Sequence, residues 1–343
     1  MNKISQILLN PGPVNLHPNV RKAFQNPDIC HREPEFMELQ RRVKTGLLDV
    51  YNAQDHKCTI ITGSGTAGIE AALSGLDNIL IVSNGHYGDR LRDMCNYYEI
   101  TYHFEKEPWQ EPLDPRKIDD YIAHYRPDFI AVVHHETSSG MLNPINKIGQ
   151  VAHDSSIKLF VDAVASFGGE NLDPYLIDIA VSSANKCLEG VPGLAFVLYR
   201  NGIQFTTRSM YLDVSKYEEG IPFTPAVHTF YALDAALQVY SHEGGLKARM
   251  NRYSKLSTQI RKGLKRLGID LCLKDEYYSR ILTSAYLPEG ISYKVLHDEL
   301  KKKGYIIYAG QGPLEDKGFR LANMGQITNE DIENLIEAIS GLL

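Results

Sequence analysis

Lys186 is the residue of this chain whose setting is most typical of a reactive amine. It lies in the segment 182–187, SSANKC, directly after the apolar run 178–183. A lysine bordered by small residues at the end of a buried strand loses hydration, which lowers the pKa of its amine and exposes a nucleophile. An isolated lysine after a strand is nearly always a solvated surface group instead. Its chemistry therefore depends on which other groups accompany it.

Asp162 is a candidate partner for this lysine. It ends the apolar run 158–163, and ligands of an open α/β sheet bind outside the carboxyl ends of its strands. A carboxylate at that place can keep the ring nitrogen of a pyridine cofactor protonated, so that the ring can accept electrons. The alternative is an aspartate that only stabilises the turn after the strand.

The segment 62–66, TGSGT, is a candidate anion-binding loop between a predicted strand and a predicted helix. Small residues let backbone N–H groups approach an anion, and the start of the helix adds favourable partial charge. Ser64, Gly65 and Thr66 are the candidate ligands, although Ser64 could merely cap the helix. An anion loop, a strand-end carboxylate and a lysine, in this order, supply the three anchor points of pyridoxal 5'-phosphate. We therefore expect this cofactor.

The elements that must position these residues alternate between apolar strands and helices through the first two-thirds of the chain. Nearly continuous apolar strands separated by helices indicate an α/β fold with a mostly parallel sheet covered on both faces. The seven predicted strands are 58–62, 78–83, 100–104, 128–135, 158–163, 178–183 and 194–199. The predicted helices are 65–76, 86–98, 114–124, 144–154, 225–242 and 245–267.

The rest of the chain has the pattern of a smaller α+β unit. Its predicted elements are a strand at 281–287, a helix at 292–303, short strands near 305–308 and 318–322, and a helix at 328–341. A chain of 343 residues exceeds what one simple hydrophobic core usually supports. We therefore predict a large domain, 1–265, that includes the N-terminal segment and the dimer contacts, and a small C-terminal domain, 266–343.

Composition excludes several classes of function. A net charge of -6 gives no reason to expect nucleic acid or an acidic membrane surface as partner. No apolar run approaches about 18 residues, so neither a signal peptide nor a membrane span is expected. The five cysteines are scattered without a CxxC pair, which suits a reducing cytoplasm. His134 and His135 lack further ligands at a suitable spacing, so we expect no metal site.

Seven longer stretches of the chain carry a resemblance to a known family. On their evidence, the chain resembles the class V aminotransferases, which belong to the fold-type I pyridoxal-phosphate enzymes. Within that family it is most similar to the branch that acts on 2-aminoethylphosphonate and pyruvate. The stretches are LLNPGPV (8–14), GSGTAGIEAAL (63–73), IVSNGHYGDR (81–90), HHETSSGMLNPI (134–145), VDAVASFGG (161–169), SSANKCLEGVPGLAFVLYR (182–200) and GFRLANMG (318–325). SANKC followed by GVPG, and HETSSGMLNPI, favour this branch over alanine–glyoxylate aminotransferases.

The resemblance implies an activity, a cofactor and an assembly. The activity is transfer of the amino group of 2-aminoethylphosphonate to pyruvate, and the assembly is a homodimer that shares its active sites. Ser64, Gly65 and Thr66 would bind the cofactor phosphate. Asp162 would pair with the ring nitrogen, and Lys186 would hold the cofactor covalently.

The resemblance also implies roles for four further residues. Tyr87 would stack on the ring, and Thr137 would lie beside its hydroxyl or its edge. Thr224 would reach the phosphate bound by the neighbouring subunit, and Arg320 would bind the acidic group of the substrate. Each has a simpler alternative. Tyr87 could be core packing, Thr224 could cap the helix that follows it, and Arg320 could form a surface ion pair.

The segment 30–36, CHREPEF, departs from the aspartate-rich loop expected for this branch. A dianionic phosphonate attracts a second cation more strongly than a carboxylate does, and Arg32 is the candidate. The alternative is that Arg32 pairs with Glu33 or Glu35 on the surface.

Other functions stay open at this point. They are an alanine– or serine–glyoxylate aminotransferase, a lyase or decarboxylase on the same fold, and a non-catalytic sensor that binds the cofactor. Cys187 directly follows the lysine on an interior turn rather than a mobile loop, which argues against a cysteine desulfurase.

Overall fold

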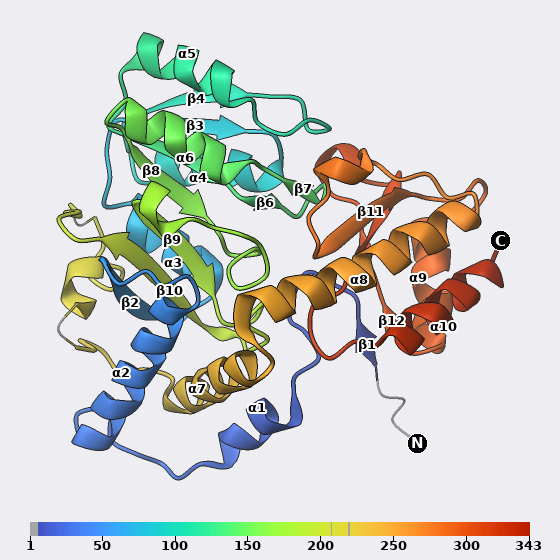
Figure 1. The fold of residues 1–343 in the computed structure, drawn as a ribbon, viewed down its shortest axis with the longest axis horizontal. Helices are drawn as coiled ribbons and strands as arrows, with labels where there is room; N and C mark the ends of the chain where they lie inside the picture. The colour runs from blue at the N-terminus through green and yellow to red at the C-terminus, as the bar shows by residue number, and fades with distance from the viewer. Residues whose placement is uncertain (1–5, 207, 219) are drawn as a thin grey trace.

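The computed structural model describes residues 6–206, 208–218 and 220–343, and a seven-stranded sheet lies beside the C-terminal elements (Figure 1). Its strands are β2 (His56–Gly63), β3 (Ile79–Ser83), β4 (Tyr102–Lys106), β5 (Phe129–Val133), β8 (Lys158–Asp162), β9 (Ile179–Ser183) and β10 (Gly193–Arg200). They lie in the order β2-β10-β9-β8-β5-β3-β4. Only β10 runs against its neighbours, β2 and β9, and the remaining pairs are parallel. The predicted α/β fold with a mostly parallel sheet is confirmed.

Helices cover both faces of this sheet, which explains why its strands are apolar throughout. Within β3, Leu80 and Val82 pack on one face with residues of α2 (Pro34–Asp49), α5 (Pro115–Tyr125), α6 (Ile145–Asp154) and α7 (Val227–His242). The alternate residues Ile79 and Ile81 pack on the other face with α3 (Gly65–Leu73) and α4 (His86–Tyr97). Successive side chains of a strand point to opposite faces, so both sets of positions must be apolar.

The C-terminal elements form a small antiparallel sheet with its own helices, beside the large sheet. Their antiparallel sheet has the order β11-β14-β13, from β11 (Leu282–Tyr286), β13 (Tyr308–Ala309) and β14 (Gly318–Ala322). The helices are α9 (Tyr293–Lys302) and α10 (Asn329–Ser340). The long helix α8 (Gly245–Arg266) runs from the large sheet to these elements (Figure 1). Leu256, Ile260 and Leu264 of α8 share a core with α10.

The start of the chain packs on this C-terminal part, although the predicted large domain includes it. β1 (Ile7–Leu8) pairs in parallel with β12 (Tyr305–Ile306), and Leu9 is buried in the same core as Ile260. A two-residue strand has too short a pattern to reveal such a distant partner. The boundary at residue 265 itself stays a prediction.

Three more details differ from the predicted elements. No helix was predicted at α1 (Pro18–Lys22) or α2, yet α2 buries Phe36, Leu39, Val43 and Leu47, which recur at helical spacing. The predicted strand 128–135 is also too long. It ends at Val133, and β6 (His135–Glu136) then pairs with β7 (Met141–Leu142) as a separate ribbon.

No helix in the described part of the chain is long and apolar enough to cross a membrane.

Candidate active site

A cavity lies where the carboxyl ends of β5, β8 and β9 meet the first turns of α3 and α4. About 480 Å³ of space not filled by protein atoms lies there, part of it open to solvent. Such an edge is where an open α/β sheet binds its ligands. Six of the predicted site residues line it, namely Gly65, Thr66, Tyr87, Thr137, Asp162 and Lys186.

Lys186 is half-buried on the turn that follows β9. Its Nζ donates a hydrogen bond to the carbonyl oxygen of Pro11. Gly12 passes so close that a Cβ added to it would lie 2.7 Å from Lys186 Cδ, and its φ of +109° also favours glycine. Burial lowers the pKa of the Lys186 amine, although the Asp162 carboxylate partly offsets this. The neutral, nucleophilic form of the amine is therefore favoured.

Asp162, at the end of β8, is only 8% exposed. Its Oδ1 accepts a hydrogen bond from the backbone N–H of Val164 at 2.9 Å. No described residue donates a hydrogen bond to Oδ2. Burial raises the pKa of this carboxyl group to about 6. The carboxylate thus lies at the cavity with one oxygen available to a positively charged ligand group.

The loop before α3 leaves backbone N–H groups without intrahelical acceptors. Ser64 is the N-cap residue, but its exposed side chain makes no capping hydrogen bond, so the simple capping role is not what the structure shows. The N–H groups of Gly65 and Thr66 lie in the first helical turn, where no intrahelical acceptor exists. Gly65 must be glycine, because a Cβ would lie 2.8 Å from Val164 Cγ1.

Arg90, which sequence reasoning missed, adds a positive charge to this loop. It lies one helical turn after Tyr87 on α4, and its Nη2 donates to Thr66 Oγ1 at 2.8 Å. Its guanidinium carbon is 5.3 Å from the centroid of the Tyr87 ring. Within the described ranges, no carboxylate lies within ion-pair distance of Arg90. The spacing of three residues from Tyr87 was the available signal, because such residues share a helix face.

Tyr87 is held at the cavity by Glu136, which is fully buried and directly precedes Thr137. Glu136 Oε2 accepts hydrogen bonds from the backbone N–H groups of Tyr87 at 3.0 Å and Gly88 at 3.2 Å. The carboxylate therefore satisfies the start of α4. Tyr87 packs against the core as well as lining the cavity, so the two readings of this residue are not exclusive.

His135 also lines the cavity and was set aside in the sequence as part of a possible metal pair. Its Nδ1 lies 3.0 Å from the carbonyl oxygen of Ala165, and its Nε2 lies 2.8 Å from Ser279 Oγ. Burial lowers the pKa of His135 to about 4, so the ring is neutral near pH 7. It connects the cavity wall to the segment that enters β11.

Arg320, on β14, is buried rather than on the surface, with 6% exposure. Its Nε donates to the carbonyl oxygen of Ala309, and its Nη1 donates to that of Thr137, both at 2.8 Å. Nη1 also reaches Gln311 Oε1 at 3.1 Å. No carboxylate in the described part of the chain forms an ion pair with Arg320, and nothing described accepts from Nη2. A buried guanidinium in this state lacks an anion.

Arg32 and Thr224 are not brought into this cavity. Both side chains are exposed, and the structure shows Arg32 paired with neither Glu33 nor Glu35. The N-cap residue of α7 is Ala226, so Thr224 is not the cap of that helix. Neither residue is among those that line the cavity.

Comparison with known proteins gives consistent matches over the whole chain. The aminotransferase class-V family model matches residues 20–312. A 2-aminoethylphosphonate–pyruvate transaminase of Phocaeicola vulgatus is 34% identical over 355 residues, covering 97% of this chain and 98% of that protein. A protein of the same name from Vibrio cholerae is 34% identical over 361 residues, covering 98% and 97%. The crystal structure of an alanine–glyoxylate aminotransferase from Nostoc sp. has a TM-score of 0.92 at 27% identity, covering 100% of this chain and 96% of that one.

Proposed function

This chain belongs to the class V aminotransferase family, and from that premise we propose that it moves the amino group of 2-aminoethylphosphonate to pyruvate, giving phosphonoacetaldehyde and L-alanine. It is an enzyme that depends on pyridoxal 5'-phosphate, as the members of its family do. The observation that carries the choice of donor is the similarity, over nearly the full length of both chains, to transaminases of that name.

The residues at the cavity fit this cofactor. Asp162 has a buried oxygen without a described hydrogen-bond donor, which would pair with the protonated ring nitrogen, and Lys186 offers an amine with a lowered pKa. Ser64, Gly65 and Thr66 would bind the phosphate through hydroxyl and N–H groups. When bound, the cofactor withdraws electrons from the carbon that carries the amino group of the donor.

Arg90 supports the same assignment. A dianionic phosphate at the start of α3 calls for a cation, and Arg90 is held there by Thr66 without a described carboxylate to neutralise it. Tyr87, below the same guanidinium, would stack on the ring, and Thr137 would lie at its edge.

Lys186 would also move the proton in each half reaction. Its Nζ would accept the proton from the donor carbon and return it to a neighbouring carbon, which requires a neutral amine within reach. The lowered pKa meets the first requirement. The Pro11 carbonyl holds Nζ at the cavity, and the absent side chain of Gly12 leaves it room.

Arg320 would bind the acidic group of both substrates. Its Nε and Nη1 are fixed by carbonyl oxygens, so its planar guanidinium presents Nη2 in a defined direction. A carboxylate or a phosphonate suits such a donor, whereas the point charge of a lysine would not reproduce its geometry. Arg32 stays in the proposal as a second cation for the phosphonate, supplied by a loop movement or by the second subunit.

The assembly and location are further parts of the proposal. We place the enzyme in a homodimer, with Thr224 of each subunit at the phosphate bound by the other, which suits its exposure outside its own cavity. We also propose a cytoplasmic location, supported by five cysteines that are all free thiols.

A screen of amino donors tests the function. Purified enzyme is mixed with 2-aminoethylphosphonate, alanine or serine, and the absorbance of the bound cofactor follows each first half reaction. We expect 2-aminoethylphosphonate to react fastest and pyruvate to restore the starting spectrum. A preference for alanine or serine with glyoxylate would favour the alternative raised by the similar Nostoc structure. Reaction that no keto acid reverses would indicate a lyase or decarboxylase, and no reaction at all a sensor.

The same half reactions test the two arginines. Arg320→Ala and Arg320→Lys should both slow the 2-aminoethylphosphonate and the alanine half reactions. Arg32→Ala should slow the 2-aminoethylphosphonate half reaction more than it slows the alanine half reaction. Arg266→Ala, an exposed arginine of α8, is the matched control and should change neither. Equal losses for both donors in Arg32→Ala, or none, would remove Arg32 from the site.

A further inference from the structure

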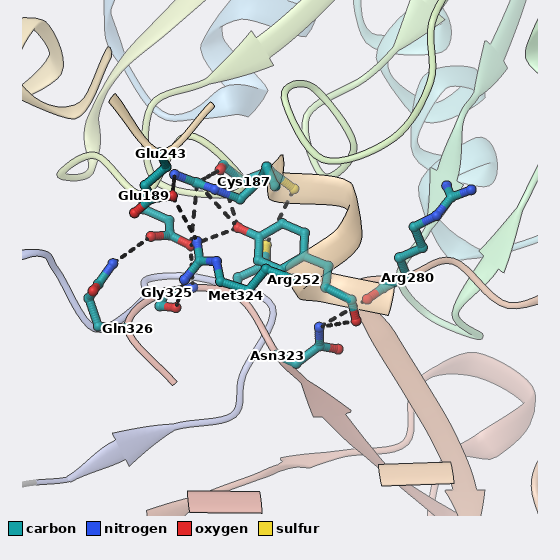
Figure 2. Close-up of polar contacts among 11 residues, drawn as sticks. Cys187, Glu189, Glu243, Arg252, Arg280, Asn323, Met324, Gly325 and Gln326 are labelled. Carbon is teal, nitrogen blue, oxygen red and sulfur yellow. Dashed lines mark hydrogen bonds and ion pairs between the residues drawn. The ribbon is translucent and has the colours of Figure 1, made fainter. Parts of the chain in front are cut away.

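A polar cluster is centred on Glu189, three residues after Lys186 in the sequence (Figure 2). The N–H of Glu189 donates to the carbonyl oxygen of Lys186 at 2.9 Å, so the two residues close one tight turn. Glu189 has a φ of +58°, which is unusual for a residue with a side chain, and it does not line the cavity. Its side chain is only 2% exposed. Its carboxylate must therefore find its partners inside the protein.

The first set of partners comes from α8. Arg252 Nη2 donates to Glu189 Oε1, and the Tyr253 hydroxyl lies 2.8 Å from the same oxygen. Arg249 Nη1 lies 3.3 Å from it and also donates to the carbonyl oxygen of Cys187. Helix α8 thus contacts the peptide that follows Lys186 through hydrogen bonds to Cys187 and Glu189.

The second set comes from the segment 323–326, which follows β14. The backbone N–H of Gly325 donates to Glu189 Oε1 at 2.9 Å, and Gln326 Nε2 donates to Oε2 at 2.9 Å. Arg252 Nη1 in turn donates to the carbonyl oxygen of Gly325 at 2.9 Å. The strand that leads into this segment carries Arg320. The Glu189 carboxylate is therefore a charged contact between the Lys186 turn and the segment that follows the strand of Arg320, where Cys187 also contacts Met324.

The charge of Glu189 makes this junction sensitive to both sides. Burial alone would raise the pKa of Glu189, but Arg249 and Arg252 outweigh it and hold the pKa below its usual range. A buried carboxylate is tolerated only while its oxygens are hydrogen-bonded, and Gln326 is the described donor to Oε2. Displacing the segment 323–326 would leave that oxygen unsatisfied unless the turn moved with it.

We propose that Glu189 is a positioning residue that links anion binding at Arg320 to the placement of Lys186. This inference rests on the proposed roles of Arg320 and Lys186. When an anion binds Arg320 and orders β14 with the segment 323–326, Glu189 transmits that order to the turn of Lys186. The substrate-binding strand and the residue that holds the cofactor then respond together.

Hydrogen exchange of the holoenzyme tests the link, with ethylphosphonate as an anion that lacks the amino group. In the wild type, we expect ethylphosphonate to slow exchange in the peptide 184–190 by about fivefold or more, the lower end of typical coupling between sites. In Glu189→Gln this slowing should largely disappear, while binding of the anion itself remains measurable by titration. A purely structural role would raise exchange with and without the anion alike.

Two more variants complete the test. Glu243→Gln is the matched control, because Glu243 contacts Arg249 and Arg252 but no residue of the segment 323–326. It should keep the slowing caused by the anion. Gln326→Leu removes the contact from the other side, so it decides the question if Glu189→Gln does not fold.

The outcomes separate this inference from the proposed function. Anion binding without slowed exchange in the wild type overturns the link alone. Slowing that is unchanged in Glu189→Gln, or equally lost in Glu243→Gln, does the same. If ethylphosphonate neither binds nor slows exchange in the wild type, both the phosphonate donor and the link are wrong.

Discussion

Three ionisable side chains at or beside the cavity are half-buried or buried without a full set of partners. Asp162 has one unbonded oxygen, Lys186 is bonded to a carbonyl oxygen rather than an acid, and Arg320 has no ion pair in the described part of the chain. Burying a charge is costly unless a partner offsets it. A cofactor with a cationic ring nitrogen and a phosphate, and a substrate with an acidic group, would supply the missing partners. The free energy lost in building the site would then be recovered when they bind.

Lys186→Ala should leave the fold intact and abolish covalent attachment of the cofactor. The substitution removes the amine and three methylene groups, and the half-buried side chain contributes little packing to the core. Borohydride reduction followed by mass spectrometry of the intact chain measures the attachment. Lys158→Ala, at the exposed start of β8, is the control and should still carry the added mass. Retention of that mass by Lys186→Ala would show that another residue holds the cofactor.

Asp162→Asn should have opposite effects on stability and on catalysis. Burial raises the pKa of Asp162 from 3.8 to about 6, so the folded state binds the proton more tightly than the unfolded state. The stability from this group is fully present below about pH 3.8 and is lost as the pH rises through 6. Cofactor-free Asp162→Asn should therefore unfold less readily than the wild type at pH 8, by up to about 3 kcal/mol, with no difference below about pH 4.

Urea unfolding of the cofactor-free proteins between pH 4 and 8 measures this difference. The holoenzyme variant should be slower in proton abstraction by orders of magnitude, since removing an electrostatic partner typically costs about 3 kcal/mol in the transition state. Near-normal turnover would rule out the ring-protonating role. A stability gain that does not change with pH would show that Asp162 is ionised in both states.

At the scale of elements, the site depends on where helices begin. The loop at Ser64 starts α3, and Tyr87 and Arg90 occupy the first turns of α4. The orientation of α4 depends in turn on Glu136, whose carboxylate accepts from two of its first N–H groups. A negative charge is favourable at this end of a helix, which helps to retain a carboxylate at complete burial. The cavity is therefore shaped in part by Glu136, which is not itself among the residues that line it.

Glu136→Ala should destabilise the protein and weaken cofactor binding together. It leaves the N–H groups of Tyr87 and Gly88 without acceptors, and each buried unsatisfied group costs about 1–3 kcal/mol. Urea unfolding and a cofactor titration measure the two effects. Glu136→Gln keeps an acceptor and should lose less of both. Equal behaviour of the two variants would mean that the charge, rather than the acceptor, holds α4.

At the scale of the whole molecule, one chain does not assemble every predicted contact. Thr224 is exposed and Arg32 is exposed, whereas the other predicted residues lie at or beside the cavity or, for Ser64, at the loop that enters it. A second subunit is the simplest source of the missing contacts, because a twofold dimer brings the same surface of each chain to the other. The homodimer is thus required by the proposal for Thr224.

Subunit mixing tests that assembly. A dimer of one Lys186→Ala chain and one Thr224→Val chain has one site with both defects and one with neither, if Thr224 acts across the interface. Such hybrids should recover activity that neither parent has. If Thr224 acts within its own chain, both hybrid sites stay defective and mixing restores nothing. A protein that is monomeric by light scattering and fully active would exclude the shared site.

The sequence by itself determined the central sheet and the order of the main site residues. The two-sided apolar strands could belong only to a sheet covered on both faces, because every second side chain meets each face. Asp162 and Lys186 follow such strands directly, and that position alone directs them to the ligand-binding edge. The local sequence pattern is sufficient here, because the strand that positions each of these residues directly precedes it in the chain.

Only the tertiary structure decided which distant segments meet. The pairing of β1 with β12, the place of Arg90 beside Thr66, and the junction of Glu189 with Gly325 all join residues far apart in the sequence. Periodicity reveals that a face is buried but not what buries it. A charged side chain likewise carries no sign of its partner until the fold brings one within hydrogen-bond distance. The sequence therefore predicts which residues can take part in the chemistry, whereas only the folded chain determines how these residues are positioned relative to one another.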